Sequence, residues 1–243
     1  MALIEQDILI TTKHGHMPGF AACPDEPGRF PSIIFYMDAP GKREELHDMA
    51  RRIATVGYYV VLPNLYYRDV TEFHLGLPGA TRERMRELMD NLSNALVCED
   101  TRSILAFLEE ETSASNGPIG AVGYCMSGPF VFAAAAEFPE RIKASASLHG
   151  VRLCIDEDSS PHLTADKIQG EIYFGCAETD DWAPPEMVEK LDAHLATTGI
   201  DYRIEWYPDT AHGFVFPQRE GIYHKESAER HWERLFSLFK RNL

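Results

Sequence analysis

The chain has 243 residues, 44% of them hydrophobic, which is enough for one sizeable core. Lys and Arg total 23 against 38 Asp and Glu, and the resulting net charge of −15 argues against nucleic acid or anionic membranes as partners. The five cysteines form no C-x-x-C pair and no spacing typical of metal ligands, so we expect free thiols in a reducing compartment and no metal site.

The first fifteen residues, MALIEQDILITTKHG, contain early acids and no long apolar core, so they do not read as a signal peptide. No apolar run approaches the roughly 20 residues needed to span a bilayer. A cytoplasmic protein with no membrane segment is therefore expected.

Strand-like and helix-like runs alternate through the first half of the chain. Two apolar runs, 7–12 and 17–24, are expected to pair as a hairpin around KHGH. The buried-strand pattern SIIFYM (32–37) is followed by apolar residues at helical spacing over 43–57, and then by the strand YYVVLPN. A charged segment, about 80–112, predicts two helices.

The same alternation continues to the end of the chain. Strands are predicted at IGAVGYC, KASASLHG, EIYFGCAE and YRIEWYP, and helices after Ser127, over 184–199 and in the segment ending HWERLFSLFKRN. This alternation predicts an α/β fold, with a mostly parallel sheet covered by helices on both faces, in a single domain over 1–243. In such sheets, functional residues gather at the carboxyl ends of the strands.

A cysteine occupies the turn between a strand and a helix in AVGYCMSGPF, residues 121–130, where Gly123 and Gly128 bracket Cys125. Acids follow a later strand in AETDDWAPPE, and His212 follows the last strand in DTAHGF. Cysteine, acid and histidine in that order, each at a strand end, fit the nucleophile elbow of α/β-hydrolases. A lone cysteine at such a turn is more often structural, but the joint pattern favours catalysis.

The chemistry explains why these residue types would occur together. An ordinary thiol is mostly protonated at neutral pH, and a histidine within reach can take its proton and return it to the leaving group. A carboxylate on the other ring nitrogen orients the imidazole. From the residues alone, Glu178, Asp180 and Asp181 all remain candidates for that carboxylate.

The motifs GYCMSG, DDWAP, AHGF and MDAPG resemble those of the dienelactone hydrolase family, and the resemblance runs from about Ser32 to about Phe239. It implies an α/β-hydrolase fold and a Cys-His-Asp triad that opens lactone or ester rings without a cofactor. The family nucleophile falls on Cys125 and its histidine on His212. The family acid has an aromatic residue two positions later and a proline four positions later, which selects Asp180.

The resemblance also implies further residues of the site. The oxyanion hole falls on the backbone N–H groups of Ala39 and Met126. A family glutamate that helps the thiol to ionise is matched by Asp38, which is shorter by one methylene. Ser127 stands where family members usually have glycine, which predicts a slightly wider elbow.

The residues expected to contact the substrate match the family pattern less closely than the triad does. Family members hold a substrate carboxylate with arginines, and Arg82 or Arg84 would match the first of these. Phe216 stands where the second is expected, with Arg219 three residues later. Aromatic residues around the triad are expected either to line an apolar pocket or to pack in the core; these are Tyr66, Tyr67, Trp182, Phe214 and Phe216.

The sequence therefore predicts a cofactor-independent hydrolase, monomeric or dimeric, that acts on a small-molecule lactone or ester. One alternative is a general carboxylesterase acting on bulky or aryl esters. Another, of a different class, is a non-catalytic protein that binds ligands or uses Cys125 as a redox sensor.

Overall fold

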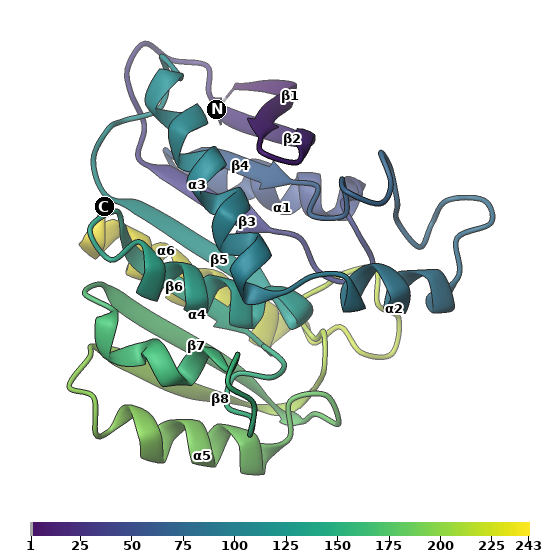
Figure 1. The fold of residues 1–243 in the computed structure, drawn as a ribbon, viewed down its shortest axis with the longest axis vertical. Helices are drawn as coiled ribbons and strands as arrows, with labels where there is room; N and C mark the ends of the chain where they lie inside the picture. Colours follow the sequence, from purple (N-terminus) through teal and green to yellow (C-terminus); the bar gives the residue numbers. More distant parts are fainter. Residues whose placement is uncertain (1) are drawn as a thin grey trace.

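The computed structural model describes residues 2–243 and contains one eight-stranded sheet with the strand order β1-β2-β4-β3-β5-β6-β7-β8. All eight predicted strands are present: β1 (Leu3–Thr12), β2 (Gly15–Pro24), β3 (Ser32–Tyr36), β4 (Tyr59–Pro63), β5 (Ile119–Tyr124), β6 (Ile142–Leu148), β7 (Glu171–Thr179) and β8 (Tyr202–Ala211). The six neighbouring strands from β4 to β8 in this order are parallel to one another. By contrast, β1 pairs antiparallel with β2, and β2 pairs antiparallel with β4. The predicted opening hairpin is thus confirmed as one end of the sheet (Figure 1).

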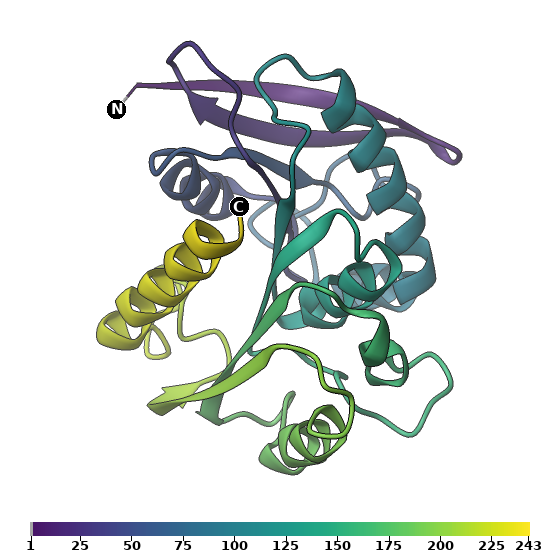
Figure 2. The same ribbon diagram turned by 90° about the vertical axis from the view of Figure 1, so that its left-hand side faces the viewer.

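Helices cover both faces of this sheet, as expected. They are α1 (Glu44–Ala54), α2 (Arg82–Asp90), α3 (Asn94–Glu110), α4 (Gly128–Glu137), α5 (Pro185–Leu195) and α6 (Lys225–Asn242). Helices α1 and α6 lie on one face, and α3, α4 and α5 lie on the other (Figure 2). Among residues 2–243, no helix combines the length and apolar character needed to cross a membrane.

The burial of the strands follows from these layers. Every residue of β3, β4 and β5 is buried, as expected for parallel strands covered on both faces. The two outer strands, β1 and β8, instead contain many exposed residues. The central strands therefore form a rigid core whose carboxyl ends carry the loops described next.

Two short 3-10 helices were not predicted. One, η1 (Cys125–Ser127), is the turn between β5 and α4, and the other, η2 (Pro161–Lys167), precedes β7. Segments this short lack the periodicity that identifies an α-helix in a sequence.

Candidate active site

Cys125 lies on a sharp turn between β5 and α4. Its φ is +54°, a left-handed conformation that is uncommon for a residue with a side chain. The turn closes because glycines occupy its tight contacts: a Cβ on Gly123 would lie 2.5 Å from the Ser127 carbonyl oxygen, and one on Gly128 would lie 2.4 Å from the Gly150 Cα. The half-buried thiol is therefore held at the carboxyl end of the sheet.

The structure brings Asp180 and His212 together from the ends of neighbouring strands. His212 Nδ1 lies 2.9 Å from Asp180 Oδ1 and 2.8 Å from Oδ2. The buried carboxylate also accepts hydrogen bonds from the backbone N–H groups of Trp182 and Ala183, both at 2.9 Å. Asp181 is exposed. Asp180 is thus fixed as the carboxylate that orients this imidazole.

The other ring nitrogen of His212, Nε2, lies on the Cys125 side of the site. Nε2 is buried and makes no hydrogen bond of ordinary geometry within residues 2–243, although the Cys125 thiol is close enough to affect it. Burial acts to lower the pKa of His212, but Asp180 and Cys125 outweigh it and raise that pKa to about 9. The arrangement therefore favours a protonated His212 next to the sulfur.

The two residues expected to supply the oxyanion donors are linked by a tyrosine. Tyr66 is fully buried, and its hydroxyl donates to the Ala39 carbonyl at 2.9 Å and lies 3.4 Å from Met126 Sδ. Ala39 follows β3, and Met126 follows Cys125 at the start of the turn into α4, where helical N–H groups favour negative charge. Tyr66 was expected only as a pocket or core residue, and its bridging contacts could not be seen in the sequence.

Asp38, expected next to the thiol, has two arginine partners. Its buried carboxylate accepts from Arg43 Nη1 at 2.5 Å and Nη2 at 3.3 Å, and from Arg219 Nη2 at 3.2 Å. Among residues 2–243, no hydrogen bond joins it to Cys125. Both oxygens are therefore engaged in ion pairs that hold the loop carrying Ala39.

Arg43 extends this contact into a cluster that joins two loops. It donates to Glu45 Oε2 at 2.6 Å, and Glu45 Oε1 accepts from the Gln218 backbone N–H at 2.9 Å. Both Arg43 and Arg219 lie over the buried ring of Phe216. Burial opposes the charge of Arg43, but Asp38 and Glu45 raise its pKa, so it remains a cation. The cluster fixes the Ala39 loop against the loop that follows His212.

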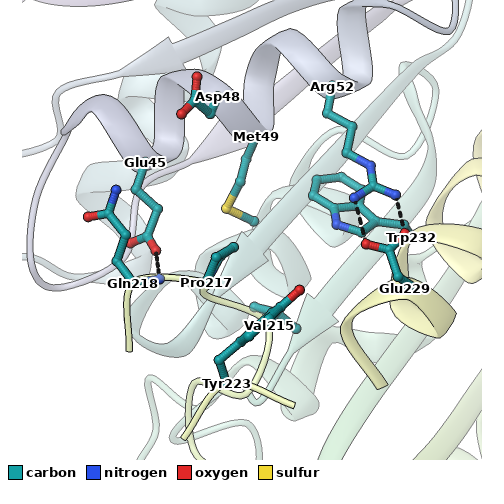
Figure 3. Close-up of a pocket in the computed structure, with 10 residues that line it drawn as sticks. All are labelled: Glu45, Asp48, Met49, Arg52, Val215, Pro217, Gln218, Tyr223, Glu229 and Trp232. Carbon is teal, nitrogen blue, oxygen red and sulfur yellow. Dashed lines mark hydrogen bonds and ion pairs between the residues drawn. The ribbon is translucent and has the colours of Figure 1, made fainter. Parts of the chain in front are cut away.

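Behind this cluster is a cavity of about 220 Å³ between α1, residues 215–218 and α6. Figure 3 shows Glu45 and Gln218 at one side of it, and the ion pair of Arg52 with Glu229 at the other. The charged groups that line this cavity are paired with other residues of the described chain. We therefore interpret it as a packing cavity and not as a ligand site.

His149 is a buried imidazole that sequence reasoning missed. It has φ +39°, and its ring lies edge-to-face on His212 with a centroid distance of 4.8 Å. Both ring nitrogens are buried and lack a hydrogen-bond partner within the described chain. Burial, together with the nearby His212, lowers the pKa of His149 well below its usual range, so it is neutral. It therefore packs against His212 without competing for the proton that His212 carries.

The expected substrate contacts are scattered. Trp182 is 66% exposed, whereas Phe214 and Phe216 are fully buried and pack around His149, so they take the core-packing alternative. Arg82 is exposed at the start of α2, and Arg84 pairs with Glu87 on the same helix at 2.8 Å. The structure brings only Arg219 of the three arginines to the site, where Asp38 holds it.

A cavity of about 250 Å³ adjoins the predicted oxyanion residue Met126. It is lined by the end of α2, the start of α3 and α4, and residues 151–161. The Val151 N–H donates to the Cys125 carbonyl at 3.2 Å, so the wall of this cavity is attached to the turn that carries Cys125.

The sheet order, the elbow and the strand-end residues define a hydrolase of the α/β type. The chain belongs to the dienelactone hydrolase family, whose model matches residues 17–243. This confirms the resemblance found in the motifs.

Relatives cover nearly the whole chain. A protein of Synechocystis sp. named "Putative carboxymethylenebutenolidase" is 28% identical over 241 residues, which is 97% of this chain and 96% of that protein. One of the same name from Methylorubrum extorquens is 26% identical, over 98% and 81% of the two chains. A crystal structure of a Klebsiella pneumoniae protein, titled "Putative Dienelactone Hydrolase", shares the fold with a TM-score of 0.89 at 23% identity, covering 99% of each chain.

Proposed function

We propose that this protein hydrolyses lactones and related carboxylic esters through Cys125, His212 and Asp180, with an acyl-enzyme intermediate. The observation that carries this proposal is the left-handed turn that presents Cys125 at the same sheet edge as the hydrogen-bonded pair of His212 and Asp180. The relatives named carboxymethylenebutenolidases support a lactone as substrate.

The reaction would begin with the thiolate of Cys125 adding to the substrate carbonyl carbon while His212 holds the proton. Backbone N–H groups of Ala39 and Met126 would stabilise the negative oxygen of the tetrahedral intermediate. As this intermediate collapses, the C–O bond breaks and His212 gives its proton to the leaving oxygen. The enolate of an opened unsaturated lactone is a good leaving group, which suits a thiolate nucleophile.

Water would complete the cycle. His212 takes a proton from a water molecule, whose oxygen adds to the thioester carbon, and the acid is released as the C–S bond breaks. Asp180 keeps the imidazole oriented in both halves and stabilises its charged form. Asp38, bound to Arg43 and Arg219, would act by fixing the Ala39 loop.

The test uses p-nitrophenyl acetate and a dienelactone as substrates. Cys125→Ala is expected to lower kcat/KM by about a thousandfold or more. Mass spectrometry of Cys125→Ser after brief mixing with ester is expected to detect an acylated protein, because the oxygen ester on serine is hydrolysed more slowly than a thioester. Retention of most of the rate in Cys125→Ala would refute the assignment.

The non-catalytic alternative makes a different prediction. If Cys125 served only as a redox sensor, its thiol would react with iodoacetamide, but wild type and Cys125→Ala would show the same rate on a broad panel of esters and lactones. A rate difference between the two proteins on any ester separates the functions.

A further inference from the structure

The cavity beside Met126 has a mainly apolar lining. Its apolar residues are Met89, Leu92, Met126, Pro129, Phe130, Val151, Ile155 and Pro161. The uncharged polar ones are Ser93, Asn94, Ser159 and Ser160. A cavity of about 150 Å³ can hold a benzene ring, so one of about 250 Å³ has room for an aromatic or medium-chain acyl group.

The charges around this cavity are unfavourable for an anion. Arg152 is the only basic residue in the lining within the described chain, and its Nη2 lies 2.9 Å from Glu157 Oε1 and 2.8 Å from Oε2. Asp90 also lines the cavity, and the exposed Asp156 and Asp158 flank Glu157 in the sequence. The one positive charge is thus already paired, and the remaining charges are negative.

The arginines expected to hold a substrate carboxylate do not change this balance. Arg82 and Arg84 are absent from the lining, and Arg84 is paired with Glu87. Arg219 is bound to Asp38 and stacked on Phe216. A carboxylate entering the cavity would therefore lose water without gaining an unoccupied cation.

We propose that this cavity selects an uncharged acyl group, and that the Arg152–Glu157 ion pair, with Asp90, is the element that rejects substrates carrying a carboxylate there. This proposal rests on the proposed function of Cys125. Arg152 has φ +52° in a loop whose neighbouring Val151 donates to the Cys125 carbonyl, so its backbone is held beside the turn that carries Cys125, whereas the side chains of Arg152 and Glu157 are 61% and 53% exposed.

The test compares two substrates of nearly the same shape, one neutral and one anionic: the p-nitrophenyl esters of 4-carbamoylbenzoic and 4-carboxybenzoic acid, each rate being divided by that of the ester's hydrolysis without enzyme. Wild type is expected to have at least a tenfold higher kcat/KM for the carbamoyl ester. Glu157→Gln releases Arg152 and is expected to reduce this preference at least fivefold, through faster turnover of the carboxylated ester. The rate on the carbamoyl ester should stay within about twofold of wild type.

Two control variants distinguish the effect of the Arg152–Glu157 ion pair on substrate preference from the effect of the protein's net charge. Glu110→Gln changes the net charge equally, but it lies at the far end of α3, about 24 Å along the helix from the cavity residue Asn94, and it should leave the preference unchanged. In Glu157→Gln/Arg152→Gln, the gain on the carboxylated ester should disappear.

Wild-type preference for the carboxylated ester, or an unchanged ratio in Glu157→Gln, would overturn the charge selection while leaving the proposed function intact. Failure of wild type to hydrolyse either ester faster than Cys125→Ala would instead overturn both.

Discussion

At the scale of single residues, the buried Asp180 and the exposed Asp181 form a natural pair of variants. Asp180→Asn is expected to lower kcat by about 10³–10⁴-fold, because an amide no longer holds the His212 tautomer that accepts the thiol proton. Asp181→Asn should remain within about twofold of wild type, because this side chain faces solvent. Equal losses in the two variants, measured on the same activated ester, would contradict the assignment of the acid.

The raised pKa of His212 predicts a pH dependence of stability. Its pKa in the folded protein is about 9, above the ordinary 6.5, so protonation stabilises the folded state fully below pH 6.5 and ceases to do so as the pH rises through about 9. The contribution is at most about 3 kcal/mol. In urea unfolding between pH 6 and 10, the stability difference between wild type and His212→Gln is expected to shrink over this range. A difference independent of pH would contradict the charged state of His212.

Short motifs at strand ends pointed to Cys125 and His212, and the family resemblance selected Asp180 among three neighbouring acids; that the three act as a triad stays a prediction. The arginine partners of Asp38 could not be predicted from the sequence. Arg43 is close to Asp38 in sequence, but Arg219 is 181 residues away. Contacts of this kind depend on how two loops fold back on each other, and neither loop has a periodic pattern. The neutral His149 was missed for the same reason.

At the scale of elements, Ser127 links the nucleophile turn to the end of β3. The sequence suggested that this serine, in place of glycine, would widen the elbow; in the structure, its fully buried hydroxyl donates to the Met37 carbonyl. Met37 is two residues before Ala39, so this hydrogen bond joins the nucleophile turn to the loop expected to supply the second oxyanion donor. The serine thus joins two loops by a hydrogen bond, which a comparison of residue sizes does not reveal.

Ser127→Ala is expected to lower the free energy of unfolding by about 1–3 kcal/mol, because it leaves a buried carbonyl without its donor. It should also lower kcat/KM by less than about tenfold. Ser32→Ala is the matched control: Ser32 is equally buried on β3, but its hydroxyl has no hydrogen-bond partner within residues 2–243, so its removal should cost little. Similar costs in the two variants, measured by urea unfolding, would show that the bond to Met37 contributes nothing.

The elements themselves were largely predictable. Apolar runs bounded by glycine or proline gave the eight strands, and helical spacing gave α1, α3, α5 and α6. The order of strands along the sheet was not predictable, because β3 lies between β4 and β5 only through pairings far apart in the sequence. Local patterns determine the type of an element, whereas pairing depends on the burial of both faces.

At the scale of the whole molecule, one continuous sheet connects the opening hairpin to β8, and this predicts a single folding domain. Cys23 on β2 and Cys176 on β7 are buried towards opposite ends of that sheet. Burial raises the pKa of both thiols, that of Cys176 to about 12, so neither should react until its strand unfolds. Half-buried Cys125 serves as the internal control that is expected to react in the folded state.

Pulsed alkylation across a urea series, read by peptide mass mapping, is therefore expected to label Cys23 and Cys176 at the same urea concentration. The loss of far-UV circular dichroism should coincide with both, because a single core leaves no part of the sheet stable alone. Labelling of Cys23 at clearly lower urea than Cys176 would mean that the β1–β2 hairpin unfolds as a separate unit. In that case, the hydrolase core would begin at β3, and the antiparallel strands would be an addition with a stability of their own.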